Sequence, residues 1–206
     1  MKDLLQVRLT DLRDRMSEQE IDTALVTDED NIFYLTGYYD YLHMEFGRPT
    51  IFVVHQQGQS LLITPQIDGN SARSLAHCDE IFSWNDGVGD EWREKLPKLI
   101  RSSKKIGIET DRIPQVVLSY LSSLGSNEKF VNFSEILDEM RMIKSPEELE
   151  VARHAGQVAN AMMKAGREAI IDGRPEFEVA IATSAAGARS AAELLDKHYT
   201  SNDISP

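Results

Sequence analysis

The chain has 206 residues, 41% hydrophobic and 27% charged, which is typical of a soluble globular protein with one domain and part of another. Its 34 acidic and 22 basic residues give a net charge of −12 without any basic block, which argues against nucleic acid as a partner. The one cysteine, Cys78, excludes an internal disulfide and a CxxC zinc site, and no apolar run is long enough to span a membrane. The first residues also lack a signal-peptide pattern, so we expect a cytoplasmic protein.

The first part of the chain predicts a helix followed by strands. An amphipathic opening helix is predicted by the spacing of Leu5, Leu9, Leu12 and Met16. Residues 23–27 then predict a strand, and residues 31–35 form a second short apolar segment. The β-type runs 51–54 and 61–63 are separated by a short break that contains Gly58, which predicts a hairpin.

Helix and strand signals then alternate along the chain. The predicted helices are residues 65–76, 90–100 and 114–124, and the predicted strands are residues 80–82, 105–109 and 130–131. This alternation predicts an α/β domain with a central sheet flanked by helices. Because of the hairpin, we expect the sheet to be mixed rather than purely parallel.

The pattern changes after about residue 132. A short helix is predicted from residue 134 to 143, and a new helix then begins with Ser145 at the N-cap, Pro146 at N1 and Glu148 at N3. Gly173 ends this helix and another follows. Each of these two helices has one face of apolar or small residues that recur every three or four positions. They are Val151, Ala155, Val158, Met162, Ala165 and Ala169 in the first, and Phe177, Ile181, Ser184, Ala188, Ala191 and Leu195 in the second. We therefore expect an α/β domain at 1–133 and, at 134–206, the first helices of an incomplete second domain.

Arg48 is the side chain that points most directly to binding. It lies at the mouth of the strand that begins near residue 51, with Phe46 as an aromatic neighbour and Gly47 between them. A guanidinium fixed at a strand end can bind a carboxylate through two parallel hydrogen bonds. The alternative is a surface arginine that closes the loop by pairing with Glu45 or Asp40.

No complete catalytic or metal-binding motif is recognisable in the sequence. The histidines at 43, 55, 77, 154 and 198 are scattered and form no HExxH or HxH set. Residues 86–90 contain acids and glycines without the ligand order of an EF-hand, and they predict a turn with Asp90 as a helix cap. We expect Cys78 to behave as a small apolar residue. The residues alone therefore predict no catalytic and no metal-ligating side chain.

Six segments, taken in this order, resemble the creatinase, prolidase and aminopeptidase P family. They are Asn31-Ile-Phe-Tyr-Leu-Thr-Gly37, Phe46-Gly-Arg-Pro49, Ile67-Asp-Gly69, Ile106-Gly-Ile-Glu109, Met140-Arg-Met-Ile-Lys-Ser-Pro-Glu-Glu148 and Pro175-Glu-Phe-Glu-Val-Ala180. The fifth segment resembles the family's interdomain junction, and the second most resembles creatinase itself. The resemblance implies the front half of such a protein, an N-terminal α/β domain followed by the start of a pita-bread catalytic domain.

The resemblance also implies a function for the parent protein. It would be a homodimeric hydrolase that cleaves a C–N bond in a small carboxylate substrate, either an amidino acid such as creatine or an Xaa-Pro dipeptide. Phe46 and Arg48 would reach the active site of the partner subunit, where Arg48 binds the substrate carboxylate. The loop Tyr38–His43 is longer than its creatinase counterpart, which leaves the substrate open.

The family's catalytic histidine and its metal ligands would lie beyond residue 206. The resemblance therefore implies no cofactor in this chain, and a divalent metal pair (Mn, Co or Zn) only in a parent of the peptidase branch. We expect this chain to be inactive alone, which leaves its status as an enzyme open. The alternative function is a non-catalytic binding or assembly module that reuses the N-terminal domain.

Overall fold

The computed structural model describes residues 2–39, 48–85, 91–125 and 127–195, and the chain divides into two compact units, Met1–Met142 and Ile143–Pro206. The helices of the first unit are α1 (Lys2–Glu18), α2 (Glu29–Thr36), α3 (Gly69–Leu75), α4 (Glu91–Ile100), α5 (Gln115–Ser123) and α6 (Ser134–Met142), with a short 3₁₀ turn, η2, at Asn127–Lys129. Its strands are β1 (Thr23–Val26), β2 (Ile51–His55), β3 (Ser60–Pro65), β4 (Glu80–Trp84), β5 (Ile106–Ile108) and β6 (Phe130–Asn132).

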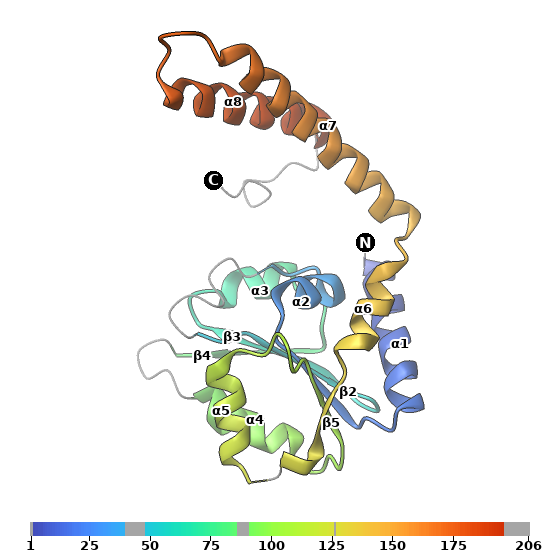
Figure 1. The fold of residues 1–206 in the computed structure, drawn as a ribbon. Coiled ribbons are helices and arrows are strands. Elements are labelled where there is room, and N and C mark those ends of the chain that lie inside the picture. The colour runs from blue at the N-terminus through green and yellow to red at the C-terminus, as the bar shows by residue number, and fades with distance from the viewer. Residues whose placement is uncertain (1, 40–47, 86–90, 126, 196–206) are drawn as a thin grey trace. The chain divides into compact units, whose positions relative to one another are not determined.

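The strands of the first unit form a sheet with helices on both of its sides (Figure 1). The sheet has six strands in the order β4-β3-β2-β1-β5-β6. Strand β2 pairs antiparallel with both β1 and β3, whereas β3–β4, β1–β5 and β5–β6 are parallel pairs. Gly58, at φ 127°, lies in the short turn that joins β2 to β3. The predicted hairpin and the predicted mixed sheet are both confirmed.

Helices cover both faces of the sheet. Because side chains alternate along a strand, Ala24 and Val26 of β1 belong to one core cluster while Leu25 belongs to the other. Helices α1, α2, α3 and α6 supply side chains to the first cluster, and α4 and α5 to the second. This three-layer arrangement confirms the expected α/β fold class.

Residues 31–35, a short apolar segment in the sequence, form most of helix α2. The Asp28 carboxylate caps its N-terminus by accepting a hydrogen bond from the backbone N–H of Asn31 at 3.0 Å. Gly37 ends the helix in the left-handed conformation at φ 73°, which glycine adopts without steric cost. The capping residues on either side therefore favour a helix for this segment.

Helix α6 belongs to the first compact unit, which ends at Met142. Its residues Ile136, Leu137 and Met140 are buried in the same core cluster as α1. The Tyr34 hydroxyl also donates a hydrogen bond to the Met140 carbonyl at 3.0 Å, which satisfies a carbonyl at the C-terminal end of α6.

The second unit contains helices α7 (Pro146–Ala169) and α8 (Glu176–Leu195). The predicted capping box is present, because the Ser145 side chain accepts from the Glu148 N–H and the Glu148 carboxylate accepts from the Ser145 N–H. A Cβ added at Gly166 would lie 2.7 Å from Thr183 Oγ1, so the two helices approach closely there. Within the described residues, no helix is long and apolar enough to cross a membrane.

Candidate functional site

Most strands of the sheet have their carboxyl ends along the same boundary, and a ligand is expected there. The carboxyl ends of β1, β3, β4 and β5 lie at this edge, and the antiparallel β2 brings its amino end there as well. The register shows this, because Val26 pairs with Phe52 and Pro65 pairs with Trp84. In open α/β sheets, ligands bind outside the carboxyl ends of the strands. We call this boundary of the sheet the carboxyl edge.

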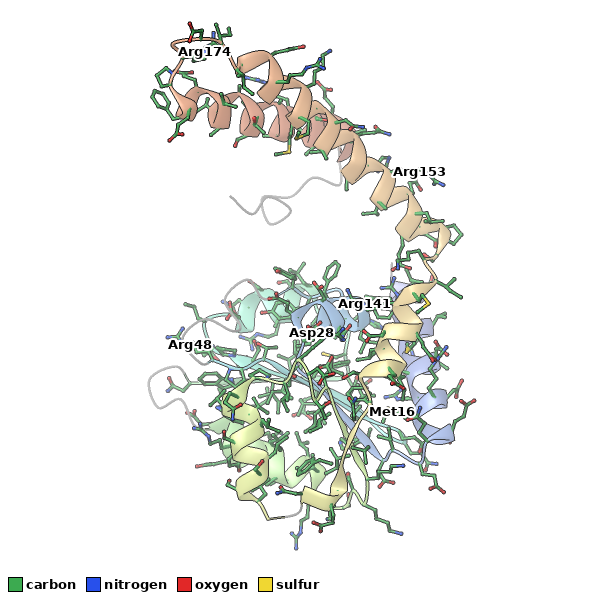
Figure 2. All side chains as sticks on the ribbon, viewed as in Figure 1. Met16, Asp28, Arg48, Arg141, Arg153 and Arg174 are labelled. Carbon is green, nitrogen blue, oxygen red and sulfur yellow. The ribbon has the colours of Figure 1, made fainter. Side chains whose placement is uncertain are left out.

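Arg48 lies at the carboxyl edge, three residues before Ile51, where β2 begins (Figure 2). Its side chain is half-buried, whereas Pro49 and Thr50, which follow it, are buried. The backbone of Arg48 thus lies close to the strand start, and its role as a ligand group stays a prediction. The other predicted ligand residue, Phe46, and the acidic alternatives Asp40 and Glu45 lie in 40–47, outside the described residues, so their roles stay predictions.

Side chains from two neighbouring strands hold the backbone beside Arg48. The indole N–H of Trp84, at the end of β4, donates a hydrogen bond to the carbonyl of Pro49 at 3.4 Å. The hydroxyls of Thr50 and Thr64 form a hydrogen bond at 3.0 Å, and both threonines are fully buried. The start of β2 is therefore attached to both β3 and β4 by side chains.

Glu109 is a fully buried carboxylate at the same edge, directly after β5. One of its oxygens accepts from the backbone N–H groups of Thr27, at 2.5 Å, and of Asp28, at 2.9 Å. The other oxygen accepts from the side-chain amide N–H of Asn31 at 2.6 Å. Glu109 thus joins the end of β5 to the end of β1 and to the first turn of α2.

Arg141 of α6 extends this network. Its guanidinium donates to the side-chain oxygen of Asn31 at 2.6 Å and lies 3.4 Å from the Asp30 carboxylate and 3.9 Å from that of Asp28 (Figure 2). Because the amide nitrogen of Asn31 donates to Glu109 and its oxygen accepts from Arg141, the orientation of the amide is defined.

Burial raises the pKa of Glu109, and the hydrogen bonds donated by Thr27, Asn31 and Asp28 act in the opposite direction. Both of its oxygens are already bonded to groups of this chain. We therefore interpret the network as a structural joint between β1, β5, α2 and α6. Sequence reasoning missed it, although the available signal was a glutamate that directly follows the buried run Ile106–Ile108.

Two other reactive groups lie away from Arg48. His55 Nδ1 is 2.9 Å from the Thr23 hydroxyl at the opposite end of β1 and β2, and burial lowers the pKa of this imidazole. Burial also raises the pKa of Cys78 to about 11, and its thiol donates to the Glu80 carbonyl. A thiol with this pKa is a poor nucleophile at neutral pH, which agrees with a packing role.

No metal centre is found in the part of the chain that the structure describes, where no three His, Cys, Asp or Glu side chains come together as a metal-binding group. Among the described residues, Arg48 is the candidate ligand group.

The fold and the carboxyl edge define a class of domain, and three comparisons agree on it. A family model described as "Creatinase/Prolidase N-terminal domain" matches residues 8–143. The creatinase of Bacillus sp. (strain B-0618) is 28% identical over 184 residues, which cover 87% of this chain and 44% of that protein. The chain therefore belongs to the creatinase/prolidase N-terminal domain family, as the resemblance implies.

Solved structures show the same fold. The prolidase from Pyrococcus horikoshii OT3 superposes with a TM-score of 0.71 at 20% identity, covering 88% of this chain and 48% of that one. The N-terminal domain of an X-Pro dipeptidase from Streptococcus pyogenes gives a TM-score of 0.56 at 19% identity and covers 65% of this chain and 98% of that one. The chain spans somewhat less than half the length of the creatinase it matches.

Proposed function

We propose that this chain is the N-terminal portion of a hydrolase that cleaves a C–N bond in a small carboxylate substrate. The observation that carries the proposal is Arg48 at the carboxyl edge, in a family with a creatinase and an Xaa-Pro dipeptidase among its members. Creatine and an Xaa-Pro dipeptide differ in their reacting groups, but both present a carboxylate and a C–N bond. A guanidinium at a strand end suits the shared carboxylate.

In this proposal the N-terminal domain binds and orients the substrate. Arg48 holds the carboxylate through two parallel hydrogen bonds, and Phe46 provides an apolar wall. The domain also supplies contacts in a homodimer, in which Arg48 serves the active site of the partner subunit. The groups that carry out the chemistry, including any divalent metal pair of the peptidase branch, belong to sequence that follows Pro206 in the parent. This chain alone is expected to be inactive on both substrate classes.

The test uses Arg48→Lys in the full-length parent, with creatine and Xaa-Pro dipeptides as substrates. A lysine keeps the charge but cannot form the two parallel hydrogen bonds. We expect KM to rise by roughly 10- to 150-fold, equivalent to about 1.5–3 kcal/mol for a hydrogen bond to a charged group, with an unchanged melting temperature.

The matched control is Arg101→Lys, since Arg101 is an exposed arginine in the same domain. It should change neither KM nor the melting temperature. An unchanged KM together with a lower melting temperature for Arg48→Lys would make Arg48 a structural residue. A natural reading frame that stops after Pro206 would support the non-catalytic module instead.

A further inference from the structure

The backbone on the carboxyl side of Arg48 is restrained at each successive residue. Pro49 has a fixed φ, and its ring also confines the preceding residue, Arg48, to extended conformations. Next, Thr50 is bonded to Thr64 at 3.0 Å. Between these two restraints lies the Pro49 carbonyl, which would otherwise be free to rotate with its peptide plane. The structure gives this carbonyl a donor, the indole N–H of Trp84 at 3.4 Å.

Trp84 itself is firmly placed. It is the last residue of β4, where it pairs with Pro65 of β3, and its own carbonyl accepts a hydrogen bond from the Gln66 N–H at 2.7 Å. Its side chain is 3% exposed and belongs to the core cluster beneath α4 and α5. The indole therefore crosses the carboxyl end of β3 to reach the start of β2. A ring fixed in this way can orient the Pro49–Thr50 peptide, two residues beyond the Arg48 amide.

We propose that Trp84 is a positioning residue, which orients Arg48 for ligand binding by holding the Pro49 carbonyl. The inference rests on the proposed function of Arg48, because Trp84 acts through Arg48 and makes no contact with substrate itself. A guanidinium that binds a carboxylate through two hydrogen bonds needs a defined direction, so the restraint on the backbone lowers the entropy lost on binding.

The first experiment measures the restraint in this chain, without any enzyme assay. Trp84→Phe keeps an aromatic ring but removes the N–H donor. We expect the backbone amide of Arg48 to become more mobile, seen as a fall in its NMR order parameter relative to the unmodified chain. Trp92→Phe is the matched control, since Trp92 is buried in the same cluster but lies on α4. An order parameter at Arg48 that is unchanged by Trp84→Phe overturns the proposal.

A second variant covers the case in which Trp84→Phe does not fold. Benzothienylalanine, which replaces the indole N–H by sulfur and keeps the ring size, is introduced at position 84 in the Trp92→Phe background. The expected increase in mobility at Arg48 is the same. A folded protein with an unchanged order parameter at Arg48 overturns the proposal here too.

The second experiment separates this inference from the proposed function. In the full-length parent, we expect Trp84→Phe to raise KM about two- to tenfold, the scale for one neutral hydrogen bond, with little change in kcat. In the Arg48→Lys background, the same change should have no further effect on KM. If Arg48→Lys raises KM but Trp84→Phe does not, the positioning role is wrong. If Arg48→Lys leaves KM unchanged, the proposed function of Arg48 fails, while the NMR result still decides the restraint.

Discussion

Asn31 shows at the scale of one residue how a buried polar side chain can define local structure. It is fully buried, donates to Glu109 at 2.6 Å and accepts from Arg141 at 2.6 Å. Both partners are ionisable side chains, so the loss of either bond would leave an ionisable group without one of its hydrogen-bond partners. Such losses cost about 1–3 kcal/mol each.

We predict that Asn31→Asp is destabilised in a pH-dependent manner. One oxygen of the new carboxylate would still accept from Arg141, but the other would replace the amide N–H that donates to Glu109. Burial already raises the pKa of Glu109, and this second negative charge would raise it further. We expect a loss of about 2–4 kcal/mol in the free energy of unfolding at pH 7.

The sign of the pH dependence follows from linkage. A carboxyl whose pKa is raised in the folded state contributes stability below its unfolded pKa and loses that contribution as pH rises through the folded pKa. The deficit of Asn31→Asp should therefore shrink as the pH is lowered from 7 toward 5. Urea unfolding at several pH values measures it, with the exposed Asn127→Asp as control. A deficit that grows toward acid pH would contradict the prediction.

From the sequence, the position of a single residue in the fold could be predicted better than the contacts between distant residues. Arg48 lies shortly before β2, where the apolar run that begins at Ile51 predicts a strand, because a strand start is a local signal. The network of Glu109, Asn31 and Arg141 joins positions 78 to 110 residues apart, and local patterns carry no information on such pairings.

At the scale of elements, the α7–α8 pair depends on small residues at the crossing. Gly166 is buried, and Thr183 Oγ1 also donates to the Val179 carbonyl at 2.8 Å, which fixes the hydroxyl that faces the glycine. An added Cβ at 166 would lie only 2.7 Å from that hydroxyl, whereas a Cβ at Gly156 of the same helix would have no atom within 4 Å. The two glycines therefore offer a matched pair of tests.

We predict opposite effects for the two substitutions. Gly156→Ala should stabilise the pair by up to about 1 kcal/mol through helix propensity. Gly166→Ala gains the same propensity but must displace Thr183, and overpacking costs about 1–3 kcal/mol, so a net loss of about 1 kcal/mol is expected. Hydrogen exchange of the α7 and α8 amides measures both. Equal protection in the two variants would show that the crossing tolerates a methyl group.

Whether a segment forms a helix or a strand could be predicted where the signal lies within a few neighbouring residues. The Ser145–Glu148 capping box specifies the start of α7 because its residues are three positions apart. Helical spacing predicts an apolar face on α8 that includes Phe177 and Ile181. These two side chains are 57% and 58% exposed, whereas Thr183 faces α7. Spacing identifies an apolar face, but it does not say which neighbour covers that face.

At the scale of the whole molecule, the strand order β4-β3-β2-β1-β5-β6 could not be derived from the sequence. The hairpin fixes the neighbours β2 and β3, since a short turn leaves only adjacent pairing. The position of β1 between β2 and β5 depends on pairing across some 80 residues, such as Ala24 with Gly107. Resemblance to a family supplied the fold that local patterns could not.

Large apolar side chains of the second unit remain open to solvent, and we predict that they cause self-association. Met163, Ile170, Phe177 and Ile181 are 72%, 71%, 57% and 58% exposed. Exposed apolar patches of this kind favour association, since burial against another copy removes them from water. A chain that ends at Met142 lacks these four side chains, so we expect it to associate more weakly than the 206-residue chain.

Light scattering coupled to size-exclusion chromatography tests this at protein concentrations from about micromolar to about millimolar. We expect the mass of the 206-residue chain to rise with concentration, and that of the chain ending at Met142 to rise less over the same range. The double substitution Phe177→Gln and Ile181→Gln should weaken the association, because it replaces apolar area by polar groups on an exposed face. The control Glu178→Gln changes an exposed residue between them and should leave the mass profile as it was. A constant monomer mass for the 206-residue chain would show that these side chains do not drive association.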